Sequence, residues 1–156
     1  MDEGLFPVDE SIPPPPPFQL RAHHYGISVP DLESSIRWYR DMLGFSVEFR
    51  TAMPHVPFTG AFLRRGNTRI ELFECPGAKP LPDERRDPDS DLATHGNKHM
   101  ALEVSDIKMA FTFLESRGVE VAMPVFESGA LAGGYVRDNS GNLIELIEHR
   151  DGRRSV

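Results

Sequence analysis

Two stretches of the chain repeat the same alternation of apolar and polar residues, and each predicts a β-strand. Residues 66–74 and 141–148 both begin with glycine-asparagine, a turn signal, and then place large apolar residues at every second position. A glutamate interrupts each apolar run, Glu71 in the first and Glu145 in the second. A carboxylate in a buried strand must be paired, hydrogen-bonded or bound to a metal, since burying it alone is costly. The two glutamates therefore indicate a shared site.

The same series of elements leads up to both of these strands. Alternating apolar residues predict further strands, and apolar residues three and four apart predict two helices, each preceded by an aspartate that can cap it. The predicted elements are a strand at 23–29, a helix from Asp31 to Gly44, strands at 45–49, 61–65 and 68–74 with a loop at 52–59, a strand at 98–104, a helix from Asp106 to Gly118, and strands at 119–123, 131–137 and 143–148.

A nearly constant offset relates the two halves of the chain. His24 and His99 lie 75 residues apart, and Glu71 and Glu145 lie 74 apart. Such spacing indicates a duplicated module of strand, helix and three strands. We expect a proline-rich arm over residues 1–20, one domain over 21–149 composed of a module at 21–74, a linker at 75–96 and a module at 97–149, and a charged tail over 150–156.

Two segments lack this periodicity. The run Pro13 to Pro17 favours an extended polyproline conformation, so the arm is either a solvated leader or a segment that a partner binds. The linker at 75–96 holds four prolines and a run of charged residues at 83–87. A loop of this length either covers a site or connects the modules as a solvated linker.

Charge and composition narrow the classes of protein. With 17 basic and 24 acidic residues, the net charge of −7 argues against a nucleic-acid surface. Cys75 is the single cysteine, so no intrachain disulfide can form, and residues 1–3 lack the basic and apolar regions of a secretion signal. Without an apolar run of about 20 residues, we expect no membrane span and a cytoplasmic location.

Each module contributes one histidine on its first strand and one glutamate on its last. His24, Glu71, His99 and Glu145 are expected to point the same way and to line a concavity. Two imidazoles and two carboxylates suit a divalent ion such as Zn, Ni, Co, Mn or Fe(II). Their apolar neighbours are expected to pack beneath the helices: Tyr25, Met100, Ile70, Leu72, Ile144 and Leu146.

Two arginines offer other partners for the glutamates. Either glutamate can instead form a structural ion pair, with Arg69 or Arg137. Arg69 also shares the strand face of Glu71, where it is a candidate for holding a substrate anion, although a surface or ion-pair role suits it equally.

The motifs, taken in order, resemble the vicinal oxygen chelate superfamily, which includes glyoxalase I, methylmalonyl-CoA epimerase, extradiol dioxygenases and bleomycin or fosfomycin resistance proteins. The resemblance covers about residues 21–149 and rests on His24-Tyr25-Gly26-Ile27-Ser28-Val29, Asp31-Leu32-Glu33, Trp38-Tyr39, Leu43-Gly44-Phe45, His99-Met100-Ala101, Asp138 and Gly141-Asn142-Leu143-Ile144-Glu145-Leu146. It implies an α+β fold in which two paired βαβββ modules form a curled mixed sheet around a metal-binding cavity. It also implies that His24, Glu71, His99 and Glu145 are metal ligands.

Three functions are compatible with this resemblance. The second glutamate favours a metal-dependent isomerase, epimerase or lyase, in which Glu145 or Glu71 moves a proton on a small oxygen-chelating substrate. The alternative is a non-haem Fe(II) dioxygenase that uses His24, His99 and one glutamate. A further alternative is a small-molecule binding or resistance protein.

We also expect a homodimer. The arm has no core of its own, and burying its apolar residues on a neighbouring chain would stabilise the association by roughly 1.5 to 3 kcal/mol for each large side chain. These residues are Ile12, Phe18 and Leu20.

Overall fold

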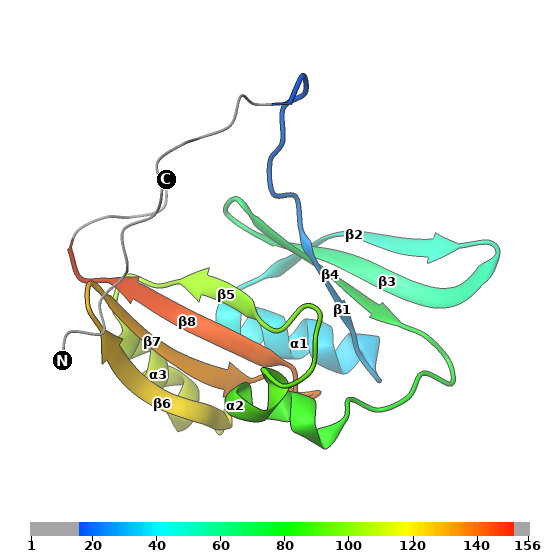
Figure 1. Cartoon of the computed structure of the whole chain (residues 1–156). Helices are drawn as coiled ribbons and strands as arrows, with labels where there is room; N and C mark the ends of the chain where they lie inside the picture. Colours follow the sequence, from blue (N-terminus) through cyan, green and yellow to red (C-terminus); the bar gives the residue numbers. More distant parts are fainter. Residues whose placement is uncertain (1–15, 152–156) are drawn as a thin grey trace.

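The computed structural model describes residues 16–151 of the chain. In chain order the elements are β1 (Tyr25–Ser28), α1 (Leu32–Leu43), β2 (Ser46–Met53), β3 (Val56–Arg65), β4 (Thr68–Glu74), a 3-10 helix η1 (Asp83–Arg86), α2 (Pro88–Asp91), β5 (Met100–Glu103), α3 (Ile107–Ser116), β6 (Val121–Ser128), β7 (Leu131–Arg137) and β8 (Leu143–His149) (Figure 1).

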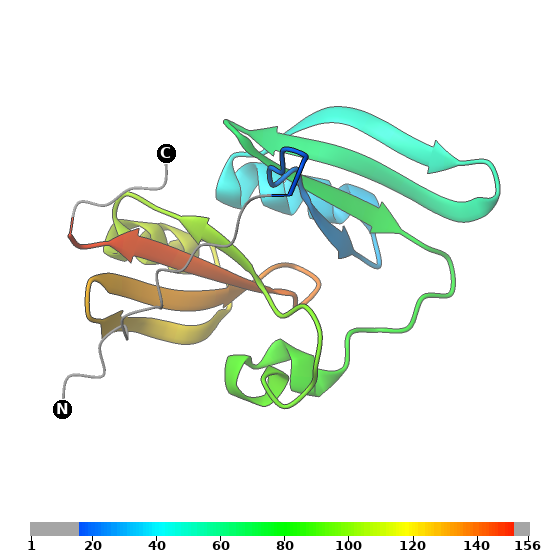
Figure 2. The ribbon, with the colours of Figure 1, turned by 45° about the horizontal axis from the view of Figure 1, so that its top comes forward.

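The strands form two four-stranded mixed sheets with the same topology. The strand orders are β1-β4-β3-β2 and β5-β8-β7-β6. The first strand of each module runs parallel to the last, and the remaining pairs are antiparallel. Figure 2 shows the two sheets as separate units that the linker connects. The predicted α+β class and the duplicated βαβββ order are confirmed.

α1 and α3 each begin on two carboxylates. Asp31 and Asp106 each accept a hydrogen bond of 2.8 Å from a backbone N–H in the first turn, as predicted. Glu74 and Glu148, at the ends of β4 and β8, accept a second first-turn N–H at 2.8 Å. The last strand of each module is therefore fastened to the start of that module's helix, a role for these glutamates that the sequence alone did not indicate.

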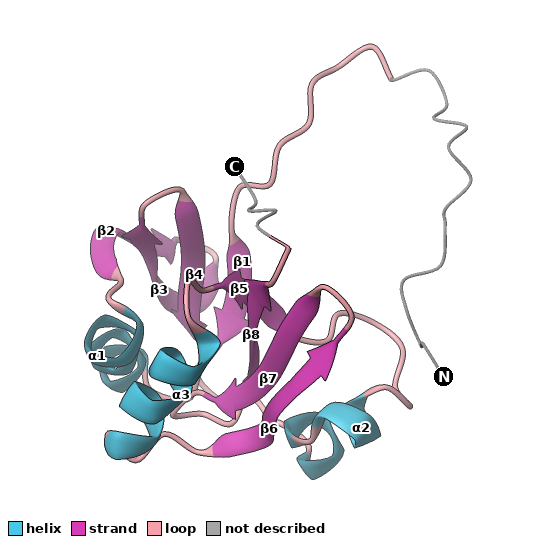
Figure 3. Ribbon diagram, turned by 90° about the vertical axis from the view of Figure 1, so that its left-hand side faces the viewer, coloured by secondary structure: helices cyan, strands magenta, loops and turns pink. Residues whose placement is uncertain are grey.

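The two modules share one hydrophobic core. Figure 3 shows α1 and α3 on the same side of the two sheets, and buried residues from both modules form a single cluster there. A buried hydrogen bond of 3.0 Å from the Tyr39 hydroxyl to Asp138 also connects α1 to the turn between β7 and β8. Of the apolar residues expected beneath the helices, Ile70, Leu72 and Ile144 are fully buried. The prediction is wrong for Tyr25, which is 44% exposed at the free edge of β1.

The loop predicted at 52–59 is instead a β-hairpin. β2 continues to Met53 and β3 begins at Val56, so that the turn occupies only Pro54 and His55. The prolines misled the prediction, because a proline removes a ladder donor. Pro57 is tolerated here because it falls in an irregularity of the β2–β3 pairing, between the pairs Met53↔Val56 and Ala52↔Thr59.

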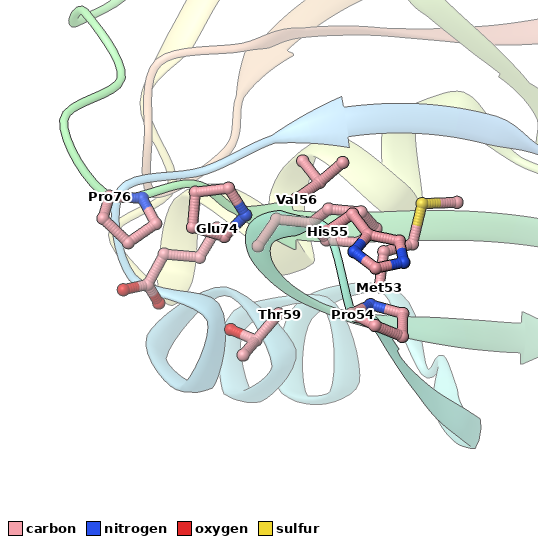
Figure 4. Close-up of a pocket in the computed structure, with 9 residues that line it drawn as sticks. Met53, Pro54, His55, Val56, Thr59, Glu74 and Pro76 are labelled. Atoms are coloured by element: carbon pink, nitrogen blue, oxygen red, sulfur yellow. The ribbon is translucent and has the colours of Figure 1, made fainter.

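A small cavity of about 610 Å³ lies at this hairpin. Figure 4 shows Glu74 at one end of it and His55 at the other, with the hairpin between them. The Glu74 carboxylate already accepts the first-turn N–H of α1. None of the four residues of the histidine-glutamate pairs lines this cavity, and we assign it no chemistry.

The linker is folded and not merely extended. It contains η1 and α2. Its buried Asp91 forms ion pairs with Arg85 at 2.9 Å and with Lys98 at 3.4 Å. The Arg137 Nε of β7 donates a 2.6 Å hydrogen bond to the backbone carbonyl of Arg86. The second half of the linker is therefore fixed to the second module.

Candidate metal and proton-transfer site

The first pair of predicted ligands lies on the sheet of the first module. β1 pairs in parallel with β4 so that Gly26 lies opposite Glu71, and His24 just precedes β1. The His24 Nε2 lies 3.3 Å from a carboxylate oxygen of Glu71, and both side chains are partly exposed. The His23 Nδ1 lies 2.7 Å from the His24 Nδ1, which leaves the Nε2 of His24 to face the carboxylate.

The second pair repeats this arrangement on the other sheet. β5 pairs in parallel with β8 so that Ala101 lies opposite Glu145, and His99 just precedes β5. The His99 Nε2 lies 2.9 Å from a Glu145 carboxylate oxygen. Each module thus presents one imidazole nitrogen beside one carboxylate oxygen.

An aromatic ring stands beside each pair. Phe62 of β3 lies directly opposite Glu71 and packs edge-on against His24, with ring centroids 4.9 Å apart. Tyr135 of β7 lies directly opposite Glu145 and packs edge-on against His99 at 5.1 Å. The repeat thus preserves a histidine, a glutamate and an aromatic ring, and comparing the two modules position by position would have found the rings from sequence.

The two aromatic positions differ by one hydroxyl. The Tyr135 hydroxyl hydrogen-bonds to Glu145, whereas Phe62 offers no donor to Glu71. Burial, followed by the charge of Glu145, raises the pKa of Tyr135 to about 12. Tyr135 therefore remains a protonated donor at neutral pH and orients the Glu145 carboxylate.

The arginines that offered alternative partners are engaged elsewhere. Arg69 forms a two-pronged ion pair with Glu48, at 2.7 and 2.9 Å. Arg137 pairs with Glu120 at 2.7 Å. The ion-pair alternative for Glu71 and Glu145 is therefore wrong, and the guanidinium of Arg69 is already occupied by a carboxylate.

The two histidine-glutamate pairs do not converge within one chain. Across residues 16–151, no three His, Cys, Asp or Glu side chains lie close enough together to hold one metal ion. His24 and His99 nevertheless line the same open cavity, of about 1220 Å³, between the free edges of β1 and β5. The donor chemistry of each pair, an imidazole nitrogen with a carboxylate oxygen, suits a divalent ion, and each pair supplies half of a four-ligand set.

Comparisons with known proteins identify the family of the chain. The model of the Glyoxalase/Bleomycin resistance protein/Dioxygenase superfamily matches residues 21–146. The chain is similar to the probable lactoylglutathione lyase of Synechocystis sp., at 32% identity over 134 residues that cover 80% of this chain and 92% of that protein. It is also similar to mitochondrial methylmalonyl-CoA epimerase of Mus musculus, at 28% identity over 131 residues that cover 81% and 71%.

Solved structures share the fold. Glyoxalase I of Leishmania major, a trypanothione-dependent enzyme, matches with a TM-score of 0.66 at 27% identity, covering 85% of this chain and 89% of that one. A glyoxalase family protein from Enterococcus faecalis matches with a TM-score of 0.68 at 22% identity, covering 82% and 97%, and shows the fold alone.

Fold and site together define a protein of two βαβββ modules that each present a histidine and a glutamate. The chain belongs to the glyoxalase/bleomycin resistance protein/dioxygenase superfamily. Its relatives in this superfamily include enzymes, an epimerase and a lyase among them. Among the described residues, no helix is both long and apolar enough to cross a membrane.

Proposed function

We propose that this protein is a metal-dependent enzyme that transfers a proton at a carbon next to a carbonyl group, as an isomerase, epimerase or lyase. The observation that carries the proposal is the presence of two equivalent histidine-glutamate pairs, so that both modules supply a carboxylate. The relatives named for methylmalonyl-CoA and lactoylglutathione support it, because both names denote acyl thioesters. We propose an oxygen-chelating acyl compound of this kind as the substrate.

His24, Glu71, His99 and Glu145 would hold the divalent ion, which we propose to be Zn, Ni, Co, Mn or Fe(II). When bound, such an ion draws negative charge from a carbonyl oxygen and makes the neighbouring carbon more acidic. Either Glu71 or Glu145 would accept the proton from that carbon and return it. Tyr135 keeps one of the two carboxylates in a fixed orientation.

A homodimer is the assembly that we propose, in the cytoplasm. Phe18 and Leu20, two of the apolar residues of the arm, are 64% and 84% exposed on the single chain, so a neighbour can bury them. The third residue of that prediction, Ile12, lies outside the described residues. A second chain could also bring the two pairs into one four-ligand site. Light scattering that gave a solution mass near 17.5 kDa at micromolar concentration would rule out the dimer.

Metal analysis tests the ligand set. Untagged protein dialysed against limiting metal is expected to retain about one divalent ion per chain, and His99→Ala should weaken metal affinity by at least about tenfold, because it removes a nitrogen donor. His55→Ala, which removes a histidine from the hairpin remote from both pairs, is the matched control. Equal metal content in the two variants, or no stoichiometric ion in the parent protein, would favour a binding protein over an enzyme.

Two further measurements separate the proposed reaction from its alternative. Turnover of the thioester substrates in deuterated solvent should place deuterium at the carbon next to the carbonyl. Activity should also persist without oxygen. An activity that stops under anaerobic conditions would replace proton transfer by the dioxygenase reaction.

A further inference from the structure

Arg86 is a cation with no anion beside it. It lies at the end of η1, half-buried, and it lines the same cavity as His24 and His99. Within residues 16–151, no carboxylate forms an ion pair with its guanidinium. The Arg86 guanidinium therefore keeps its charge and its donors available to an anion that enters the cavity.

The neighbouring arginine shows what a structural role in this segment looks like. Arg85 pairs with the buried Asp91 at 2.9 Å and donates to the backbone carbonyl of Asn97. Lys98, also in the cavity wall, is bound to the same Asp91. Both of these charged side chains serve the fold of the linker, whereas the Arg86 guanidinium forms no such ion pair.

Arg86 is held in place by its backbone and by a close packing contact. Its carbonyl accepts the 2.6 Å hydrogen bond from the Arg137 Nε, and the Nη1 of the same arginine is bound to Glu120. Its guanidinium lies against Gly141, where an added Cβ would stand only 2.9 Å from the Arg86 Nε and 3.0 Å from its Cζ. The glycine therefore gives the guanidinium room beside the turn that leads into β8, the strand of Glu145.

The anionic groups of the cavity wall do not neutralise this charge. Glu74 is the one carboxylate among the residues that line the cavity, and it accepts the N–H of Leu32 at the start of α1. A second cation, Lys79, is an exposed residue of the cavity wall and forms no ion pair within the described residues. The chain has a net charge of −7, but the wall of the cavity beside His24 and His99 carries more positive than negative side chains.

We propose that Arg86 binds an anionic group of the substrate, a carboxylate or a phosphate, and so selects acidic acyl compounds. A guanidinium fork matches the two oxygens of either group and fixes its orientation, which would place the remainder of the molecule toward His99 and Glu145. The assignment of this anion to the substrate rests on the proposed function. The anion site itself does not.

The test uses succinate and inorganic phosphate as probes, titrated into the full-length protein as purified and followed by backbone amide shifts in NMR. Both arms are run, so that the preferred anion is identified, and neutral succinamide is the matched control ligand. Arg86→Gln is expected to weaken binding of the preferred anion by about tenfold or more. Arg86→Lys should retain part of the affinity, since it keeps the charge and loses the fork. Arg117→Gln, which removes a cation that packs on Phe113 away from the cavity, should leave affinity unchanged.

Saturable shifts at Gly141 and Asn142 with an anion but not with succinamide would support the site. Equal loss of affinity in Arg86→Gln and Arg117→Gln, shifts elsewhere on the molecule, or no saturable binding would overturn it. Metal content measured on the same samples separates the two proposals. Anion binding by protein that contains no metal would contradict the proposed function but not the anion site. A normal metal content without anion binding would contradict the proposed role of Arg86 but not the proposed function.

Discussion

Replacing Glu145 by Gln is expected to lower the rate of proton exchange on the substrate by about 10²–10⁴-fold, the range that general acid-base groups contribute. The substitution keeps the size of the side chain but removes the charged oxygen that lies 2.9 Å from His99. Deuterium incorporation from solvent, followed by NMR with methylmalonyl-CoA and lactoylglutathione as substrates, measures the loss directly.

A graded series makes this result specific. Tyr135→Phe retains the ring against His99 and removes only the hydroxyl, and its loss should be about 10–100-fold, as for other groups that orient a ligand. Because the pKa of Tyr135 is about 12, the effect should be the same at mildly acidic and mildly alkaline pH. Glu115→Gln, on the exposed face of α3, should have no effect. An unimpaired Glu145→Gln variant would show that this carboxylate takes no part in the reaction.

Asp138→Ala is expected to lower the free energy of unfolding by about 3–5 kcal/mol, because it leaves one buried and three part-buried donors without their acceptor. Asp138 is only 5% exposed and accepts the Tyr39 hydroxyl at 3.0 Å. It also accepts the backbone N–H of Ser140 at 2.8 Å and both the backbone and side-chain N–H groups of Asn142, at 2.9 and 2.8 Å. Denaturant unfolding followed by circular dichroism measures the change.

Two further variants show which contacts account for the change in the free energy of unfolding. Tyr39→Phe removes only the hydrogen bond between modules and should cost about 1–2 kcal/mol. Asp41→Ala removes an exposed aspartate whose ion pair with Arg40 lies in solvent, and it should leave the free energy of unfolding nearly unchanged. If Asp138→Ala is no more destabilising than Asp41→Ala, the contact between modules contributes little to stability.

The local rules that can be read from sequence worked where a structural feature depends on neighbours in the chain. Asp31 and Asp106 cap their helices as predicted, because a cap needs only a short oxygen-bearing side chain three residues before an amide. The offset between the modules also identified His24 with His99, and Glu71 with Glu145, as equivalent positions, and the structure gives these equivalent residues the same arrangement in both modules.

Features that depend on distant partners were not accessible in this way. The hairpin turn at Pro54 was hidden by prolines that a bulge accommodates, and Tyr25 lies at a sheet edge that no periodicity reveals. The separation of the two pairs depends on how the modules pack. Arg86 belongs to a run of charged residues in which the structure alone distinguishes the bound guanidinium of Arg85 from the free one.

The hydrogen bond that Glu74 accepts from the start of α1 determines where the chain can change direction after β4. Because the Glu74 carboxylate accepts the Leu32 N–H at 2.8 Å, the end of the strand that carries Glu71 is fixed to the start of α1. Gly77, with φ of 76° and open space around it, lies three residues farther on and can absorb a change of backbone direction. The chain therefore changes direction in a turn closed by the 3.1 Å hydrogen bond from the Ala78 N–H to the Cys75 carbonyl, and residues 75–82 form part of the cavity wall.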